Sequence, residues 1–350
     1  MSAPEQQAHE ILTHYGMGGS QVEAFGTGLI NATFLVTVAP DLQFVLQRLN
    51  PLFPPEINGD IDELTRHLAV RGAVTQRLMP ADNGQLWVEA NDEVWRLSTF
   101  VPGVCYDKLA SEEQAREAGR LLGYFHRLVG DLDIELHGNR LGVHDTQRHL
   151  AALRTALEEH RDHRYYPAIK VLAEDVLTCA DALPELPPLP DRLVHGDPKI
   201  SNLVFDEATG KGVCMIDLDT LAYMPLPLEI GDAIRSWCNP KGEDEAQANF
   251  RMDFFTAAMS GYAAEAGASL VPPVWQSFVP AAHTIMVELA ARFTTDALNE
   301  NYFGWNPDKF ADRSAHNQVR AAGQLNLHRS FLQHEAEATA AVEAAFFDPV

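Results

Sequence analysis

The sequence predicts an α+β fold with two lobes. A small lobe built on an antiparallel sheet is expected at residues 1–102, and a large, mainly helical lobe at residues 103–350. Short segments rich in β-branched and aromatic residues, separated by Gly and Asn-Asp turns, fill most of the first part. In the second part, apolar residues recur three and four positions apart, which is typical of amphipathic helices. A chain of 350 residues is long enough for two cores, and Pro102-Gly103 is placed as a hinge would be.

The charge and composition exclude several classes of protein. The net charge of −23 argues against nucleic acid or an anionic membrane as a partner. No run of 18 apolar residues indicates a transmembrane helix, and the N-terminus does not resemble a signal peptide. The 4 cysteines are widely spaced and form no C-x-x-C pair, so we expect reduced thiols. The sequence therefore predicts a cytoplasmic protein, and it gives no indication of an oligomeric state.

The small lobe begins with a helix at residues 5–16, followed by strands at 22–25, 32–38 and 41–50, a helix at 57–71, and a hairpin of strands at 85–89 and 93–101. Gly26 and Gly28 lie in the turn between the first two strands. Because glycine lets backbone N–H groups approach a ligand closely, this turn is a candidate for binding phosphates. A plain hairpin turn is the alternative interpretation.

The large lobe is expected to be helical on both sides of a central polar stretch. Helices are predicted from Ser111 through Val129, at 147–159 and 166–180, from near Glu229, and at 244–266, 272–298 and 315–345. His126 lies beside the apolar stripe of the first of these and is interpreted as a packed or capping histidine. The proline-rich segment 183–190 is expected to be a rigid connector.

The central stretch, residues 191–219, has an unusual density of polar groups between apolar strands. A short strand at 193–194 ends at His195-Gly196, and a loop then carries Asp197, Lys199 and Asn202. Two further strands, 203–205 and 213–216, lead to Asp217 and Asp219. Three carboxylates, one amide and one lysine are thereby predicted to converge beside a hairpin.

This pattern indicates phosphoryl transfer. Asp-x-x-x-x-Asn is the spacing of the kinase catalytic loop, in which the aspartate accepts the proton of the substrate hydroxyl. Asp197 is the candidate base, and Lys199 is placed to approach the transferring phosphate. Asn202 and Asp217 are candidate Mg²⁺ ligands, because Mg²⁺ prefers a few hard oxygen donors. A surface loop of solvated acids is the alternative, but His-Gly before the loop and Ile-Asp-Leu-Asp after it favour catalysis.

A kinase also requires a cation on the third strand, aimed at the nucleotide phosphates. Gln47 occupies the position where a lysine is expected, and Arg48 follows one residue later. Since neighbouring strand residues point to opposite faces, Arg48 would need a bulge to replace that lysine. Arg48 is nevertheless the predicted source of the charge, with an exposed strand-edge arginine as the alternative. Glu63, on the following helix, is either its partner or an exposed carboxylate.

With these motifs in place, the chain resembles the aminoglycoside phosphotransferase/choline kinase superfamily, and within it most closely the N-acetylhexosamine 1-kinase group. The resemblance covers nearly the whole chain. It depends on segments 26–33, 44–50, 195–202, 216–220, 231–235, 288–296 and 302–303. It implies a protein-kinase-like fold with ATP and Mg²⁺ as cofactors, and transfer of the γ-phosphate to the anomeric hydroxyl of a hexosamine or related hexose.

The resemblance also implies roles for individual residues. Asp197 would activate the sugar hydroxyl, and Asp219 would lie near the metal or contribute to its binding. Asn31 and Thr33 would belong to the nucleotide site, together with Gly26, Gly28, Gln47, Arg48 and Glu63. Arg235, Arg292 and Tyr302 would contact the acceptor. Two alternatives remain open: a kinase of another small alcohol of the choline, homoserine or aminoglycoside type, and a nucleotide-binding pseudokinase.

Overall fold

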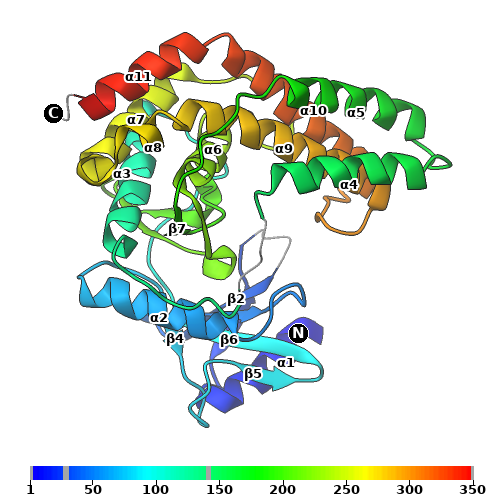
Figure 1. Ribbon diagram of the computed structural model, residues 1–350. Helices are drawn as coiled ribbons and strands as arrows, with labels where there is room; N and C mark the ends of the chain where they lie inside the picture. Colours follow the sequence, from blue (N-terminus) through cyan, green and yellow to red (C-terminus); the bar gives the residue numbers. More distant parts are fainter. Residues whose placement is uncertain (1–2, 27–30, 139–142, 348–350) are drawn as a thin grey trace. The chain divides into compact units, whose positions relative to one another are not determined.

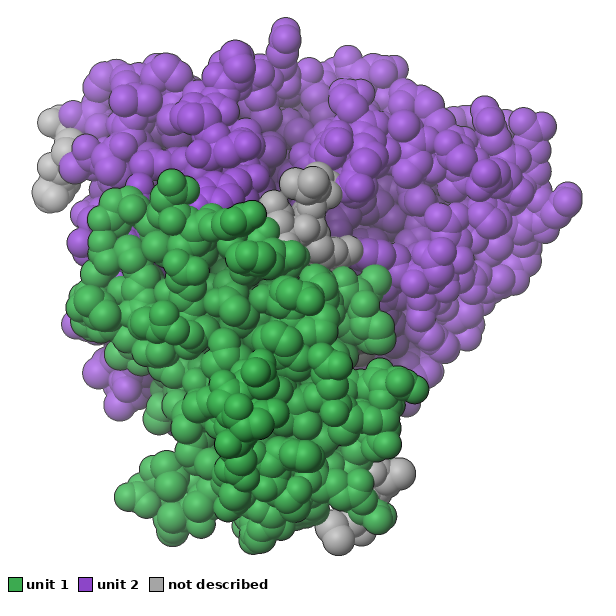
Figure 2. Space-filling model, turned by 60° about the horizontal axis from the view of Figure 1, so that its bottom comes forward, with its two compact units in different colours: residues 1–102, 131–139, 216–221 green, residues 103–130, 140–215, 222–350 purple. Residues whose placement is uncertain are grey.

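A computed structural model describes residues 3–26, 31–138 and 143–347. The chain divides into two compact units, shown in different colours in Figure 2. Unit 1 comprises residues 1–102, 131–139 and 216–221, and unit 2 comprises the remainder. The sequence prediction had assigned residues 131–139 and 216–221 to the larger lobe. Among the described helices, none is both long and apolar enough to cross a membrane.

Unit 1 is built on a 6-stranded antiparallel sheet (Figure 1). Its elements are α1 (Ala3–Leu12), η1 (Thr13–Tyr15), β1 (Gln21–Ala24), β2 (Ala32–Ala39), β3 (Leu42–Arg48), α2 (Ile57–Val70), β4 (Leu78–Met79), β5 (Val88–Ala90), β6 (Glu93–Thr99) and η3 (Leu218–Thr220). The strand order is β1-β2-β3-β6-β4, with β5 also paired to β6. The expected hairpin strand at 85–89 is therefore shorter, and β4 was not predicted.

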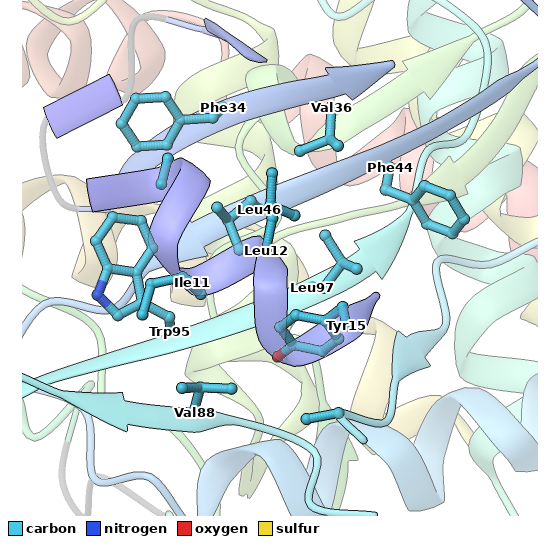
Figure 3. Packing of buried hydrophobic residues seen from close by; sticks show 12 residues of the cluster. Ile11, Leu12, Tyr15, Phe34, Val36, Phe44, Leu46, Val88, Trp95 and Leu97 are labelled. Atoms are coloured by element: carbon cyan, nitrogen blue, oxygen red, sulfur yellow. The ribbon is translucent and has the colours of Figure 1, made fainter. Parts of the chain in front are cut away.

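The two faces of this sheet differ sharply in chemistry because side chains alternate along each strand. One face buries Phe34, Leu46 and Trp95 against Ile11 and Leu12 of α1 (Figure 3). The other face carries the polar neighbours of these residues, Thr33, Gln47 and Arg96. The register pairs Thr33 with Gln47 and Gln47 with Arg96, so these three form a row across β2, β3 and β6.

Unit 2 is mainly helical, with two small antiparallel ladders, β7–β10 and β8–β9. Its helices are α3 (Glu112–Val129), α4 (Thr146–Glu159), α5 (Tyr166–Asp181), η2 (Ile200–Asn202), α6 (Leu226–Trp237), α7 (Met252–Ala266), η4 (Gly267–Ser269), α8 (Pro272–Trp275), α9 (Phe278–Asn299), α10 (Arg313–Leu332) and α11 (Glu335–Phe347). Its strands are β7 (Asp191–Val194), β8 (Leu203–Phe205), β9 (Gly212–Met215) and β10 (Ala222–Pro225). Helix α9 is the central element: it packs against α4, α5, α6 and α10, and it is buried along most of its length (Figure 1).

Several expected helix boundaries in unit 2 were wrong. The helix predicted at 244–266 begins only at Met252, because α10 holds the preceding segment in a non-helical path. Arg320 binds Asp244, and the Ser330 hydroxyl accepts the N–H of Phe250. The helix predicted at 315–345 is two helices, the one predicted at 272–298 is interrupted between α8 and α9, and the one near Glu229 begins at Leu226. Strand β10 was not predicted.

Candidate active site

The loop after β7 begins with two buried residues held by a distant carboxylate. His195 is fully buried, and Gly196 has a φ of 84°, a conformation that glycine adopts without steric cost. The N–H of Gly196 donates to Glu229 Oε1 at 2.8 Å. Glu229 lies on α6, so this helix fixes the start of the loop through its own first turn.

Glu229 is part of a buried network that the sequence prediction missed. Its other carboxylate oxygen pairs with His126 Nε2, and His126 Nδ1 lies 2.8 Å from the hydroxyl of Tyr262. Burial opposes ionisation of Glu229, but the nearby histidines His126 and His195 and the Gly196 N–H hold its pKa below the ordinary value. The network connects α3, α6 and α7 behind the loop. His126 is indeed a packed histidine, and its role is to orient Glu229.

The three candidate catalytic side chains of the loop lie together. Lys199 Nζ donates to Asp197 Oδ2 at 2.5 Å, and Asn202 Nδ2 donates to the Asp197 carbonyl oxygen at 2.9 Å and to Oδ2 at 3.2 Å. The Asp197 side chain is 22% exposed, whereas Asn202 is buried. Among the described residues, the side-chain hydrogen bonds to this carboxylate reach Oδ2. Its Oδ1 is therefore the oxygen able to accept a proton from a hydroxyl.

The charge of Asp197 is stabilised by two cations. Burial raises the pKa of this carboxyl, but Lys199 and Arg235 outweigh it and hold the pKa below the ordinary value. Arg235 is itself nearly buried and bound by Asp232 at 2.8 Å and by Glu243 at 2.6 Å. Arg235, predicted to contact the acceptor, therefore has two carboxylate partners within the protein. The effect of Arg235 that the structure supports is to lower the pKa of Asp197.

Helix α6 also fixes the far side of the loop. The indole N–H of Trp237 donates to the Pro198 carbonyl oxygen at 2.9 Å, and the Ser236 hydroxyl accepts the N–H of Ile200 at 3.1 Å. Together with the Glu229 contact to Gly196, these contacts anchor the loop on both sides of Asp197, the candidate base. Such anchoring keeps a reactive side chain in one geometry.

Unit 1 contains a second polar cluster, centred on Arg96 of β6. Arg96 Nη1 donates to Asp219 Oδ1 at 2.5 Å, and both side chains are almost completely buried. The other Asp219 oxygen accepts from Asn31 Nδ2 at 2.8 Å, and Asn31 Oδ1 accepts the N–H of Asn50. Both oxygens of Asp219 are thus occupied within the protein. Asp219, predicted as a metal contributor, is bound here by Arg96 and Asn31 of unit 1, and the predicted metal and nucleotide roles of Asp219 and Asn31 stay predictions.

The predicted third-strand residues separate onto opposite faces of the sheet. Gln47 Oε1 accepts from Arg96 Nε at 3.0 Å and from Nη2 at 2.8 Å, and Gln47 Nε2 lies 3.3 Å from Thr33 Oγ1. Arg48 points to the other face, where it pairs with Glu93 at 2.8 Å and lies over Trp95. The side chains of Gln47 and Arg48 therefore lie on opposite faces of the sheet, because no bulge interrupts the alternation there. Arg48 does not supply a charge on the face that carries Gln47.

Two other predicted nucleotide-site residues do not join this cluster. Glu63 is exposed on α2, where the buried polar residue beside Arg96 is Asn58, at 3.5 Å. Gly26 has a φ of 78°, which suits a tight turn. Gly28 lies outside the described residues. The strongest missed signal is Arg96 itself, a lone cation between Trp95 and Leu97 in an apolar strand.

Asp217 has an unusual backbone conformation. It has a φ of 63°, a left-handed conformation that costs a non-glycine residue energy and recurs at functional sites. In the described parts of the chain, no three His, Cys, Asp or Glu residues form a group that could hold a metal alone. Mg²⁺ does not require one, since phosphate oxygens and water complete its shell. The Asn202 amide donates through Nδ2, which leaves its oxygen as the atom suited to a metal.

A pocket of about 460 Å³ lies within unit 2 and contains both predicted acceptor residues on α9 and the following loop, Arg292 and Tyr302. It is lined by Val143, Arg148, His149, Ala152, Arg292, Thr295, Asp296, Asn299, Asn301, Tyr302 and Phe303. The loop is shaped by Asp296, whose carboxylate accepts the N–H groups of residues 301, 302 and 303 and the amide of Asn317. Arg292 lies over the ring of Phe303.

The chain matches the phosphotransferase enzyme family over residues 21–267, more than half of its length, and it belongs to this family. A microcompartment-associated aminopropanol kinase is 16% identical, with 95% of this chain and 98% of that chain covered and a TM-score of 0.63. An amicoumacin kinase solved with AMP-PNP and Ca²⁺ is 12% identical, with 93% of each chain covered and a TM-score of 0.63. A choline/ethanolamine kinase family protein from Mesorhizobium loti is 14% identical, with 97% and 98% covered and a TM-score of 0.56.

These comparisons confirm the α+β, protein-kinase-like fold and the resemblance to the phosphotransferases. The narrower resemblance to the N-acetylhexosamine 1-kinases stays a prediction. At such low identities the solved structures establish the fold and not the acceptor.

Proposed function

We propose that this phosphotransferase moves the γ-phosphate of Mg·ATP to a hydroxyl of a small sugar, with the anomeric hydroxyl of an N-acetylhexosamine or related hexose as the first candidate. The observation that carries the proposal is the state of Asp197, an ionised, partly exposed carboxylate with one oxygen bound by Lys199 and Asn202. A binding module has no need of such a base. A cytoplasmic location, where ATP is plentiful, is part of the proposal.

In the proposed reaction, the acceptor hydroxyl donates its proton to Oδ1 of Asp197 as its oxygen attacks the γ-phosphorus. The bond between that phosphorus and the β,γ-bridging oxygen breaks, and the electron pair leaves with ADP. Lys199 offsets negative charge beside the transferring group. Asn202 and Asp217 are the proposed protein ligands of Mg²⁺, which neutralises phosphate charge when bound. Gly26 and Thr33 remain candidates for contact with the nucleotide.

The pocket in unit 2 supports a sugar over a cationic acceptor. Asp296 is its only carboxylate among the described lining residues, and four hydrogen bonds from the protein already saturate that group. Arg148 and Arg292 add positive charge, which opposes binding of an ammonium group. The asparagine amides, Arg292 and the rings of Tyr302 and Phe303 suit the hydroxyls and apolar faces of a pyranose.

A second candidate is a kinase of another small alcohol. It is favoured by the fold that this chain shares with an aminopropanol kinase and a choline/ethanolamine kinase family protein. The names of those two proteins describe kinases of small alcohols. The pseudokinase alternative is supported only by Gln47 at the expected lysine position. The presence of Asp197 argues against it, because a binding module needs no base.

The decisive experiment is an acceptor screen with the purified protein, ATP and Mg²⁺, read by ADP release and then by phosphorus NMR of the product. We expect turnover with an N-acetylhexosamine or hexose and a phosphate on C1. Turnover confined to amino alcohols, homoserine or aminoglycosides would replace the sugar proposal by the second candidate. Binding of Mg·ATP without transfer to any acceptor would favour the pseudokinase.

A matched variant tests the acceptor pocket. Arg292→Gln should raise the acceptor KM by about tenfold, the equivalent of one lost charge-assisted hydrogen bond, and leave the KM for ATP unchanged. Arg154→Gln, on α4 outside the described pocket lining, is the control and should change neither constant. An unchanged acceptor KM in Arg292→Gln would remove this pocket from the proposal.

A further inference from the structure

The cation that the fold places on the polar face of the sheet comes from β6 and not from β3. Arg96, Gln47 and Thr33 stand in one row of the register, and Gln47 accepts two hydrogen bonds from the guanidinium. A lysine at position 47 would set a second positive charge against Arg96. An uncharged amide there is therefore what a charge on the neighbouring strand requires.

Arg96 is the link between the sheet and residues 216–221. This segment groups with unit 1, whereas the strands on either side of it, β9 and β10, belong to unit 2. Asp219 connects this segment to the rest of unit 1 through its side chain. Its Oδ1 accepts a hydrogen bond from Arg96, and its Oδ2 accepts one from Asn31. Asn58 of α2 adds a weaker contact to the same guanidinium.

The pair is built for geometry more than for stability. Arg96 and Asp219 are 1% and 2% exposed, and the cost of removing two charges from water offsets most of their attraction. In the described part of the chain, the side chains that hydrogen-bond to the pair are neutral amides: Gln47, Asn58 and Asn31. A fork-shaped guanidinium bound on several sides has one orientation, and it imposes that orientation on Asp219.

We propose that Arg96 is a positioning residue for the divalent-cation site: it fixes Asp219, and through the chain it fixes Asp217 two residues earlier. The strained backbone of Asp217 requires such a restraint, because a free segment would relax to a conformation of lower energy. The inference rests on the proposed phosphotransfer, in which Asp217 is a Mg²⁺ ligand.

The first test measures binding of Mg·AMP-PNP by calorimetry, together with the Mg²⁺ concentration that gives half-maximal activity. Arg96→Gln should weaken Mg·AMP-PNP binding about tenfold or more and raise the Mg²⁺ requirement, while the acceptor KM stays unchanged. Arg71→Gln is the control, since Arg71 also pairs with a carboxylate of unit 1, Asp131, but lies away from this cluster. Wild-type binding in folded Arg96→Gln would overturn the proposal.

A double variant separates positioning from simple stability. Arg96→Met with Asp219→Leu removes the whole ion pair, so the protein should unfold near the wild-type temperature even if Arg96→Gln does not fold. Positioning predicts that its Mg·AMP-PNP binding remains weak. Recovery of both the unfolding temperature and nucleotide binding would show that the pair is only structural.

The binding readout keeps this inference apart from the proposed function. If the wild type binds Mg·AMP-PNP but phosphorylates no acceptor, the proposed function fails while the effect of Arg96 stays measurable. If an acceptor is phosphorylated and the Arg96 variants bind Mg·AMP-PNP normally, the inference fails while the function stands.

Discussion

In the proposed reaction, Asp197 has to be ionised before the transfer and still accept a proton during it. Lys199 and Arg235 lower the pKa of the carboxyl, which keeps it charged at neutral pH. Because both loop contacts to its side chain use Oδ2, the other oxygen is left for the substrate. In this proposal, the oxygen that is stabilised by Lys199 and Asn202 is Oδ2, and the oxygen that accepts the proton is Oδ1.

Asp197→Asn should lower kcat by roughly 10²–10⁴, because an amide of the same shape cannot accept the proton. Binding of Mg·AMP-PNP should change less than about twofold, since Asp197 is not a proposed metal ligand. Single-turnover kinetics and calorimetry measure the two quantities. Near-full turnover in this variant would refute the assignment of the base. In the wild type, the lowered pKa also predicts no acid limb due to Asp197 between pH 5 and 8.

The sequence predicted the residues that follow a short local pattern. Asp197, Lys199 and Asn202 lie within six positions, and their spacing alone indicated their proximity. Glu229 and Arg96 were missed because their partners lie 33 and 123 positions away. A signal existed for each: a carboxylate among apolar residues in Leu-Glu-Ile, and a cation between tryptophan and leucine in a strand. Neither signal indicates which residue is the partner, and the partners become evident only in the folded chain.

Among the elements, helices α3 and α7 pack closely against each other, and two glycines make the contact possible. A Cβ on Gly119 would lie 1.9 Å from the carbonyl oxygen of Ala258, and one on Gly261 would lie 2.0 Å from that of Arg116. Both neighbours are backbone atoms of the facing helix, which cannot move aside alone. Helix α3 also carries His126, so the spacing of this pair reaches the Glu229 network.

Gly119→Ala should therefore destabilise the protein by about 1–3 kcal/mol, the range of overpacking, although alanine favours a helix. Gly59→Ala is the matched control on α2, where a new Cβ meets no atom within 4 Å, and it should be neutral or stabilising by up to about 1 kcal/mol. Urea unfolding measures both. Equal stability of the two variants would show that the α3–α7 contact yields easily.

Element types were predictable where periodicity was clear, and boundaries failed where tertiary contacts decide them. The alternation in β3 and β6 and the long apolar stripes of α3 and α9 are visible in the sequence. The segment before α7 has helical composition, but contacts with α10 satisfy its polar groups in another conformation. Strand β10 follows a proline-rich pattern that argues against a strand, yet it is an edge strand paired only with β7.

At the scale of the molecule, a buried histidine pair connects stability to pH. His283 of α9 and His328 of α10 pack ring against ring, and burial lowers the pKa of each to about 4. In the unfolded chain their pKa is about 6.5. Between these values the unfolded state binds protons that the folded state does not, so stability is full above about pH 6.5 and falls as the pH falls towards 4.

This linkage predicts a loss of about 2 kcal/mol per histidine in the free energy of unfolding between pH 7.5 and pH 5. His328→Leu, which places an apolar side chain against the ring of His283, should reduce that loss while keeping the core filled. Urea unfolding at the two pH values measures the difference. The same pH sensitivity in wild type and variant would show that His328 makes no contribution to it.

The Arg96–Asp219 pair joins two parts of the chain that are made at different times during synthesis. Residues 1–102 leave the ribosome first, with Arg96 already in the middle of β6. Its carboxylate partner is made 123 positions later, after α3, α4 and α5 have emerged. Until then Arg96 lacks Asp219, the carboxylate that binds it in the folded protein. We therefore expect the polar face of this sheet to reach its final arrangement only after the segment that carries Asp217 and Asp219 has been made.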